Sequence, residues 1–323
     1  MRNASIIAVL AIAASACQSE NEMRFVSTLD AETNGVAMSR SGNDSHVGMS
    51  GMTCTISTEW GCPIDDADLP TREERVLDHY DGMTLATTAG TVHQIDAQGW
   101  RRTDDIAAAG VRAARYATKG MMIVHGDADA CFVQQGDQQT SIPGILCDEG
   151  LDVEVDRGGS ALFTATRHGV YVVDLERGAE KVIEGDLVAW DTTLNQIYTA
   201  TSGETTVIAT QRDGTEVWTT DVGLPITSIA TRGDKGQVLV LTESTDGFGN
   251  LVRLDGIDGS TLGNSELPDS VGEVEVSGNG QTVAIVRPTE VHYFSMVLES
   301  EGESEVVERD PPSCLQDDQI SAD

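Results

Sequence analysis

The chain has 323 residues, with 20 lysines and arginines against 53 aspartates and glutamates, which gives a formal net charge of −33. A protein this acidic repels phosphate groups, so nucleic-acid binding and adsorption to an anionic membrane surface are excluded as general functions. Its length would allow two domains, but the repeat described below favours one.

The first 16 residues have the features of an export signal. Arg2 supplies a positive charge, and residues 5–14 form an apolar segment that is too short to span a membrane. The segment ends in Ala14-Ser15-Ala16-Cys17, which resembles the processing site of bacterial lipoproteins. The resemblance implies that residues 1–16 are removed and that Cys17 becomes the acylated first residue. The alternative is an ordinary signal peptide cleaved after Ala16.

Residues 17–33 follow as a lipidated cysteine and a polar, acidic tether. Within it, residues 25–29 form an apolar stretch that could be a strand closing the fold. In the lipoprotein family an aspartate after the cysteine retains the protein at the inner membrane. Residue 18 is Gln, so the resemblance implies localisation in the cell envelope, at the outer membrane, facing the periplasm or the cell surface.

A repeat with a period near forty residues covers 34–310. Strand-like apolar segments end at residues 96, 135, 174, 211, 255 and 295, at steps of 39, 39, 37, 44 and 40. Turns rich in Gly, Asp and Asn separate them, and the period is that of a four-stranded propeller blade. Six units are clear, with 304–309 as the last outer strand, and 34–68 fits a seventh.

We therefore predict an all-β fold, a single β-propeller of seven four-stranded blades at 34–310, with six blades as the alternative. An acidic, flexible tail is expected at 311–323. Because the repeat is unbroken, the chain should contain one folded domain, which lies between the tether and the tail.

Segments 206–223 and 251–267 resemble the repeats of pyrroloquinoline-quinone-type propellers, whereas 276–286 resembles those of tryptophan-aspartate propellers. The matching positions are the strand-ending acids, the turn glycines and an outer-strand tryptophan: Asp174, Asp255, Gly214, Gly259 and Trp218. With the lipoprotein signal, the chain is similar by class to the propeller lipoprotein of the outer-membrane barrel-assembly machinery. It is shorter and has no motif specific to that protein, so the resemblance implies architecture and no chemistry.

The cysteines suggest an oxidising compartment. Once Cys17 is acylated, five remain. Cys131 begins one predicted strand and Cys147 ends the next, so hairpin pairing would place them opposite each other, and Cys54 and Cys62 bracket the equivalent turn in the first unit. We predict disulfides 54–62 and 131–147, which leaves Cys314 unpaired, while pairing of Cys314 with Cys54 or Cys62 stays open.

Two loops between strands carry unusual polar or apolar residues. One contains His125, Asp127 and Asp129, and the longer loop at 245–250 contains Asp246, Phe248 and Asn250. Nitrogen and oxygen side chains of this kind could hold a divalent cation, and loops on a rigid ring could bind a protein. A solvated polar loop is the alternative for the first of them.

Ionisable residues also lie on the predicted inner strands, where they would face the central channel: Asp78, His79, Glu154, Asp156, Asp191, Glu273 and Glu275. They predict an acidic channel, but they form no recognisable catalytic set. Adjacent cysteines, which several quinoprotein enzymes place against their cofactor, do not occur in the chain, so quinoprotein catalysis is unsupported.

The sequence favours an outer-membrane-anchored propeller lipoprotein that acts as a protein-interaction scaffold in the cell envelope and needs no cofactor. Its partner would be an envelope or extracellular protein with a basic patch, with no nucleic acid involved and membrane contact only through the lipid. One alternative is a lyase- or lactonase-type propeller enzyme with an acidic metal site in the channel. The other is a sensor of a small ligand or a divalent cation.

Overall fold

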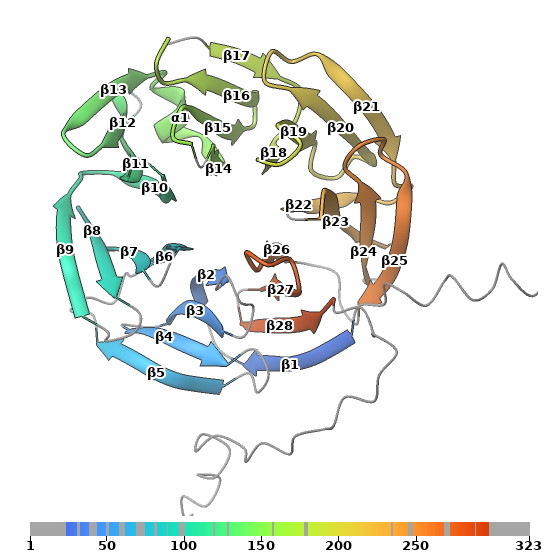
Figure 1. Cartoon of the computed structure of the whole chain (residues 1–323), viewed down its shortest axis with the longest axis horizontal. Coiled ribbons are helices and arrows are strands. Elements are labelled where there is room, and N and C mark those ends of the chain that lie inside the picture. Colours follow the sequence, from blue (N-terminus) through green and yellow to red (C-terminus); the bar gives the residue numbers. More distant parts are fainter. Residues whose placement is uncertain are drawn as a thin grey trace, which may run out of the picture.

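The strands form a ring of seven four-stranded antiparallel sheets around a central axis (Figure 1). This computed structural model describes residues 24–296 except 31–32, 39–43, 50–51, 58–61, 69–74, 81–82, 89, 97–100, 119, 128, 157, 178–179, 234, 245–247, 268–271 and 288. The prediction of an all-β propeller is confirmed. We number the sheets as blades 1 to 7 in the order of their inner strands.

Each of the first six blades contains four consecutive strands, ordered from the axis outward. Blade 1 has β2 (Thr33–Met38), β3 (Asp44–Met49), β4 (Met52–Ser57) and β5 (Cys62–Asp68), and blade 2 has β6 (Arg75–Tyr80), β7 (Met83–Thr88), β8 (Thr91–Asp96) and β9 (Arg101–Ala107). Blade 3 has β10 (Val111–Ala117), β11 (Gly120–Gly126), β12 (Cys131–Gln135) and β13 (Gln138–Ile142), followed by the short helix α1 (Ile145–Asp148).

The other half of the ring repeats this order. Blade 4 has β14 (Gly150–Val155), β15 (Ala161–Thr166), β16 (Gly169–Asp174) and β17 (Glu180–Ile183), and blade 5 has β18 (Leu187–Asp191), β19 (Gln196–Ala200), β20 (Thr206–Gln211) and β21 (Glu216–Asp221). Blade 6 has β22 (Ile226–Arg232), β23 (Gln237–Glu243), β24 (Gly249–Asp255) and β25 (Thr261–Leu267). Blade 7 combines β26 (Glu273–Val276), β27 (Thr282–Val286) and β28 (Glu290–Ser295) with β1 (Arg24–Asp30).

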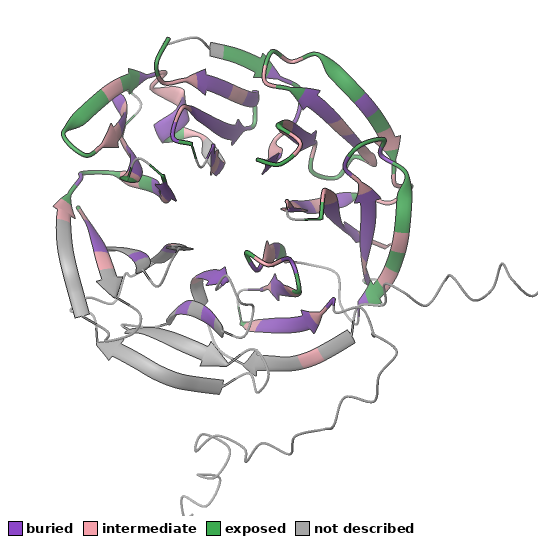
Figure 2. Ribbon diagram, in the orientation of Figure 1, coloured by how far each residue is buried: buried purple, intermediate pink, exposed green. Residues whose placement is uncertain are grey.

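The second and third strands are largely apolar because both faces of each blade are covered by neighbours. All six residues of β15 are buried, and so are five of the seven residues of β23. In the outer strand β25 only one residue of seven is buried. Figure 2 shows this gradient from buried inner positions to an exposed outer edge. Continuous apolar runs are what sheets packed on both faces require.

The N-terminal strand closes the ring. β1 pairs with β28 from Arg24↔Ser295 to Asp30↔Glu290, which confirms the closing strand expected near 25–29. The propeller therefore begins at Arg24, inside the segment predicted as a tether. β1 also holds the outer position that the sequence assigned to residues 304–309, which lie outside the described part of the chain.

One predicted disulfide is confirmed, and the side chains of the other predicted pair, Cys54 and Cys62, lie outside the described residues. Cys131 and Cys147 are bonded, with their Cα atoms 5.6 Å apart, although Cys147 lies on α1 and not on a strand. In blade 1 the register places Cys54 opposite Asp66 and Cys62 opposite Ser57. The two cysteines are therefore not directly opposite each other in the backbone register, and the pairing 54–62 stays a prediction. Cys17 and Cys314 lie outside the described residues.

Candidate functional site

The connections between strands emerge on two opposite faces of the ring. Because successive strands alternate in direction, loops between second and third strands emerge on one face, and turns between third and fourth strands emerge on the other. We call the first the loop face, which carries Asp127, Asp129, Ala130, Ser244 and Phe248. The second is the turn face, which carries residues 136–137, 212–215 and 256–260.

The loop with His125, Asp127 and Asp129 is braced from within. Oδ1 of Asp127 accepts backbone N–H groups from Asp129 at 3.0 Å and Ala130 at 2.9 Å. The His125 ring packs beside Phe132, with ring centroids 5.8 Å apart. Within the part of the chain that the structure describes, no group of three His, Cys, Asp or Glu residues could hold a metal ion. These three residues thus form a capped turn, and they are not gathered into a cation site.

The second loop presents an aromatic side chain to solvent. The Ser244 N–H donates to the Phe248 carbonyl at 2.8 Å, which closes the loop, and Thr242 Oγ1 donates to the Asn250 carbonyl at 3.2 Å. Phe248 is nevertheless 46% exposed. A phenyl ring held out by a braced loop is a surface that another protein can cover. Asp246 lies outside the described residues.

Charged side chains gather where the inner strands approach the axis. Arg115 on β10 is half-buried and donates through Nη1 to the Leu77 carbonyl of the preceding blade. Burial alone would lower the pKa of Arg115, but the carboxylates of Asp78, Glu154 and Glu275 outweigh it and raise the pKa. The sequence located the three acids and missed the arginine, although a cation in the middle of an inner strand of so acidic a chain was the available signal.

The remaining channel candidates are not all axial. Asp156 is buried in the turn after β14, where it pairs with Arg212 at 2.8 Å. Asp191 is buried at the end of β18, and its Oδ1 accepts the N–H groups of Thr193 and Leu194. Both therefore stabilise turns, which corrects the prediction for them. Glu273 is exposed, and the side chain of His79 lies outside the described residues.

Glu275 makes the axial cluster sensitive to pH. Burial raises the pKa of Glu275 to about 8, and the carboxylates of Glu154 and Asp152 add to this, while Arg115 opposes it. The folded protein therefore holds a proton that the unfolded chain releases above its ordinary pKa of 4.5. Stability from this group is present at acidic pH and is lost as pH rises toward 8.

We expect Glu275→Gln, which mimics the protonated acid, to match the wild type near pH 5 and to be roughly 2–4 kcal/mol more stable at pH 9. Urea unfolding between pH 5 and 9 measures the difference. The exposed neighbour substitution Glu273→Gln is the control and should show little change with pH. A Glu275→Gln advantage that is constant or that shrinks with pH would contradict the assignment.

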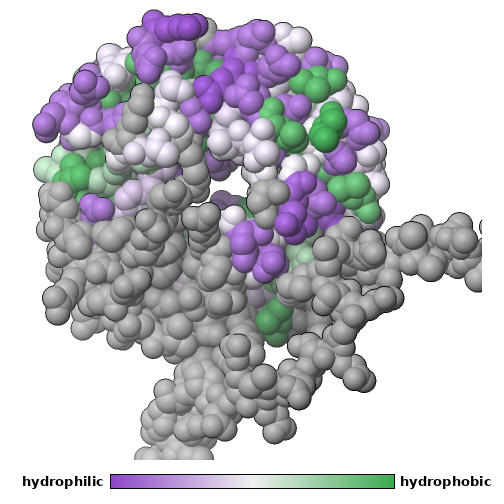
Figure 3. All heavy atoms as spheres, viewed as in Figure 1, coloured by the Kyte–Doolittle hydropathy of each residue, from purple (hydrophilic) through white to green (hydrophobic). Residues whose placement is uncertain are grey.

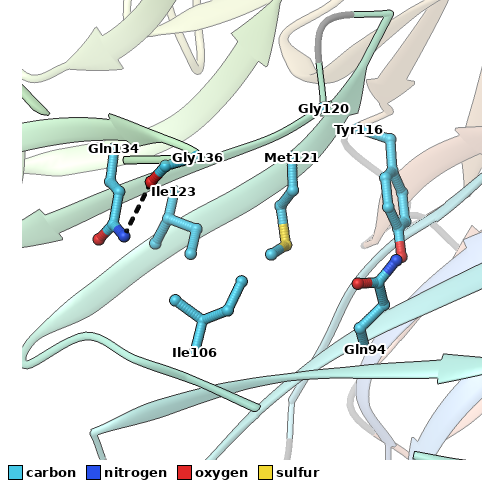
Figure 4. Close-up of a pocket in the computed structure, with 8 residues that line it drawn as sticks. All are labelled: Gln94, Ile106, Tyr116, Gly120, Met121, Ile123, Gln134 and Gly136. Atoms are coloured by element: carbon cyan, nitrogen blue, oxygen red, sulfur yellow. Dashed lines mark hydrogen bonds between the residues drawn. The ribbon is translucent and has the colours of Figure 1, made fainter. Parts of the chain in front are cut away.

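A pocket of about 300 Å³ lies between blades 2 and 3 at the turn face (Figure 4). Ile106, Met121 and Ile123 form its apolar wall. The Gln94 amide lies beside the Tyr116 hydroxyl at one end, and Gln134 Nε2 donates to the Gly136 carbonyl at 3.3 Å at the other. An apolar floor between polar ends suits an amphipathic group. Sequence reasoning missed this pocket because its residues come from five strands and a turn.

The rest of the described surface is largely polar. Figure 3 shows hydrophilic side chains over most of the visible described surface, interrupted by separate apolar groups. The large apolar residues that are exposed, within the described residues, are Val182, Val217, Phe248, Ile257 and Leu262. No described helix has the length and apolar character needed to cross a membrane.

Comparisons with known proteins identify a fold. No family model and no curated protein matches the chain. A chain in the crystal structure of the mitotic checkpoint complex is similar with a TM-score of 0.69 at 12% identity, covering 92% of this chain and 97% of that one.

Two further solved structures are similar. The β-propeller domain of Cps50 (Swd1) from Myceliophteria thermophila has a TM-score of 0.65 at 12% identity, covering 85% of this chain and 99% of that one. Hsv2 from Kluyvelomyces marxianus has a TM-score of 0.59 at 11% identity, covering 80% and 90%. At such low identities the likenesses establish the fold alone, and the chain is a β-propeller.

Proposed function

We propose that this protein is a protein-interaction scaffold that a lipid on Cys17 tethers to the cell envelope, at the outer membrane. The observation that carries the proposal is Phe248, a ring 46% exposed on a loop that its own backbone hydrogen bond closes. The flanking strands β23 and β24 are the second and third strands of blade 6, and five of the seven residues in each are buried. A rigid base keeps such a ring in position without an entropic cost on binding.

Charge supports the choice of partner. The chain carries −33 at neutral pH, so a partner with a basic patch would be attracted over a distance and its association would weaken with salt. One of the similar structures is a chain within a protein complex, the mitotic checkpoint complex, which is consistent with a propeller serving as an assembly platform.

Phe248→Ser should abolish most capture of the partner while leaving the fold intact, because the ring is exposed and the loop is held by backbone. A loss of at least tenfold is expected for an aromatic anchor at the centre of an interface. Capture is measured by cross-linking in intact envelopes followed by quantitative mass spectrometry of peptides linked to residues near 248. Val182→Ser, which removes an equally exposed apolar side chain (49%) from β17, is the matched control.

If Phe248→Ser and Val182→Ser retain the same cross-links, the loop is not the interface and the scaffold proposal loses its main support. If Phe248→Ser instead lowers the urea midpoint, the loop belongs to the folded core. A fall in capture with rising salt, at constant stability, would support the basic partner patch.

The lipid anchor has its own test. Cys17→Ser removes the thiol that would be acylated, so the protein should move from the membrane fraction to the soluble envelope or secreted fraction. Fractionation with immunodetection measures the shift, and Cys314→Ser is the control that keeps the anchor. Retention of the Cys17→Ser protein in the membrane would overturn the lipoprotein assignment.

A further inference from the structure

The blades share a register that makes positions comparable around the ring. The outer strands of blades 1, 2, 5, 6 and 7 each carry a one-residue bulge at the same place opposite the third strand. The bulge fixes which residues are equivalent. Next to it, third-strand residues pair with outer-strand residues as Gln94↔Asp104, Ala209↔Trp218, Arg253↔Gly263 and Tyr293↔Ser27.

Between blades 5 and 6 this position holds an indole ring. Trp218 is buried, its Nε1 donates to the Gly256 carbonyl at 2.8 Å, and Tyr198 packs against it with ring centroids 5.7 Å apart. The turn after β24 folds over the ring so closely that a Cβ at Gly259 would lie 2.6 Å from it. The protein thus buries one tryptophan, 8% exposed, at an interface between blades.

Between blades 7 and 1 an aromatic ring again occupies the interface. Tyr293, equivalent to Ala209, reaches from the third strand, is fully buried and shares a hydrogen bond of 2.5 Å with Ser45 Oγ. Here the aromatic residue comes from the third strand and its small partner, Ser27, from the outer strand. Two interfaces therefore hold an aromatic ring whose single polar group finds a partner.

The pocket between blades 2 and 3 is the open counterpart of the Trp218 slot. Counting from the bulge, the lining residues Gln94 and Ile106 correspond to Ala209 and Thr220. Blade 3 has no such bulge, so its residues are counted from the last residue of the third strand, Gln135 in blade 3 and Asp255 in blade 6, which makes Gln134 equivalent to Leu254. Ile123 and Gly136 correspond in the same way to Val238 and Gly256. Three of these five counterparts, Ala209, Val238 and Leu254, belong to the apolar cluster around Trp218.

Two local differences leave this counterpart open. Asp104 holds the register position of Trp218, so no indole is supplied from the outer strand. The turn after β12 has only two residues, Gly136 and Asp137, where the turn that covers Trp218 runs from Gly256 to Ser260. The volume of about 300 Å³ is twice that of the roughly 150 Å³ apolar cavity known to admit benzene.

We propose that this pocket binds a tryptophan side chain presented by a partner protein. The indole would lie on Ile106, Met121 and Ile123. Its N–H would donate a hydrogen bond to the Gly136 carbonyl, as the Trp218 N–H donates to the Gly256 carbonyl. The space beyond one indole admits the main chain that carries it. The inference deepens the proposed scaffold function, but it concerns the turn face, whereas Phe248 lies on the loop face, so the two can fail separately.

The probe is N-acetyl-L-tryptophanamide, followed through the methyl resonances of Met121 and Ile123 in the full-length protein. We expect saturable shifts with a dissociation constant of roughly 1 mM, as suits a ligand of this size, and at least about fivefold weaker binding of N-acetyl-L-leucinamide. The tryptophan pentapeptide Gly-Gly-Trp-Gly-Gly amide should bind at least as tightly as free indole. If free indole binds and the peptide does not, the pocket is a small-molecule site, and the proposal that a partner protein presents the tryptophan is overturned.

The matched variant restores the internal occupant. Gln94→Ala with Asp104→Trp recreates the Ala209 and Trp218 pair in blade 2, so the pocket should fill and probe binding should fall at least tenfold. Met121→Lys, at a partly exposed position, places a charge in the pocket and should have the same effect if the double variant fails to fold. Unchanged affinity in a folded variant, absent shifts, or equal binding of the leucine probe would each refute the proposal. In the Phe248→Ser protein the probe should bind normally.

Discussion

Deletion of residues 24–30 should cost most of the protein's stability and convert it into an associating species. The deletion removes β1 and with it every backbone pair between Arg24↔Ser295 and Asp30↔Glu290. It exposes β28, whose residues Val291 and Tyr293 are fully buried, as an open edge. We expect a loss of roughly 5 kcal/mol or more, which is comparable with the whole stability of a typical domain.

Urea unfolding followed by circular dichroism measures this loss, and light scattering measures association. Deletion of residues 18–23, which precede β1, is the control and should leave the urea midpoint unchanged. A synthetic peptide of residues 24–30 should restore part of the lost stability by pairing with β28. A deletion protein that unfolds at the wild-type midpoint would mean that the ring does not depend on β1.

Arg212→Ala should give the second largest loss of stability, roughly 2–3 kcal/mol, because it removes the cation from a largely buried carboxylate, although the Arg212 side chain itself is 32% exposed. Arg212 joins blades 4 and 5: its Nη2 lies 2.8 Å from Oδ2 of Asp156, and its Cζ lies 4.7 Å from the Trp190 ring centroid. Trp190 in turn stacks on Phe163 at 4.6 Å. Loss of the guanidinium leaves a carboxylate that is 7% exposed without its cation and uncovers the stacked rings.

The pH dependence of this effect has a defined sign. Burial alone would raise the pKa of Asp156, but hydrogen bonds from Ser160 and Arg212 outweigh it and lower the pKa below 3.8. The pair therefore stabilises the protein above that pH and loses its contribution as pH falls further. The gap between wild type and Arg212→Ala should narrow below about pH 4, and Arg212→Ala with Asp156→Asn should recover part of the loss at pH 7. A pH-independent gap would exclude the ion pair as its source.

The sequence period reveals this fold because each blade repeats the same pattern of four strands and their turns. Trp218 stands out as a repeat tryptophan, and the apolar runs at 161–166 and 237–243 predict doubly covered strands. Side-chain direction is harder to predict, since it depends on register. Inner strands β6, β10 and β14 each have an irregularity near their first residues, which shifts the alternation that sequence reasoning assumed for the channel.

The candidate sites depend on contacts between blades, which no local pattern encodes. Asp156 and Asp191 stand at the ends of inner strands, so they turn back to cap the chain rather than face the axis. Arg115 and Glu275 influence each other's charge only because blades 3 and 7 both border the axis. The pocket at Gln94 is recognisable only after the bulged register shows which residue replaces Trp218.

Ring closure through β1 also sets an order of events during synthesis. The strand that leaves the ribosome first, Arg24–Asp30, can pair only with Glu290–Ser295, which is made after the other six blades. Contacts between such distant segments form slowly, and an unpaired strand invites association in the meantime. The nascent chain thus carries an unpaired strand edge at each end of the unclosed ring until β28 has been made, so a chaperone that shields the N-terminal segment would raise the yield of closed rings.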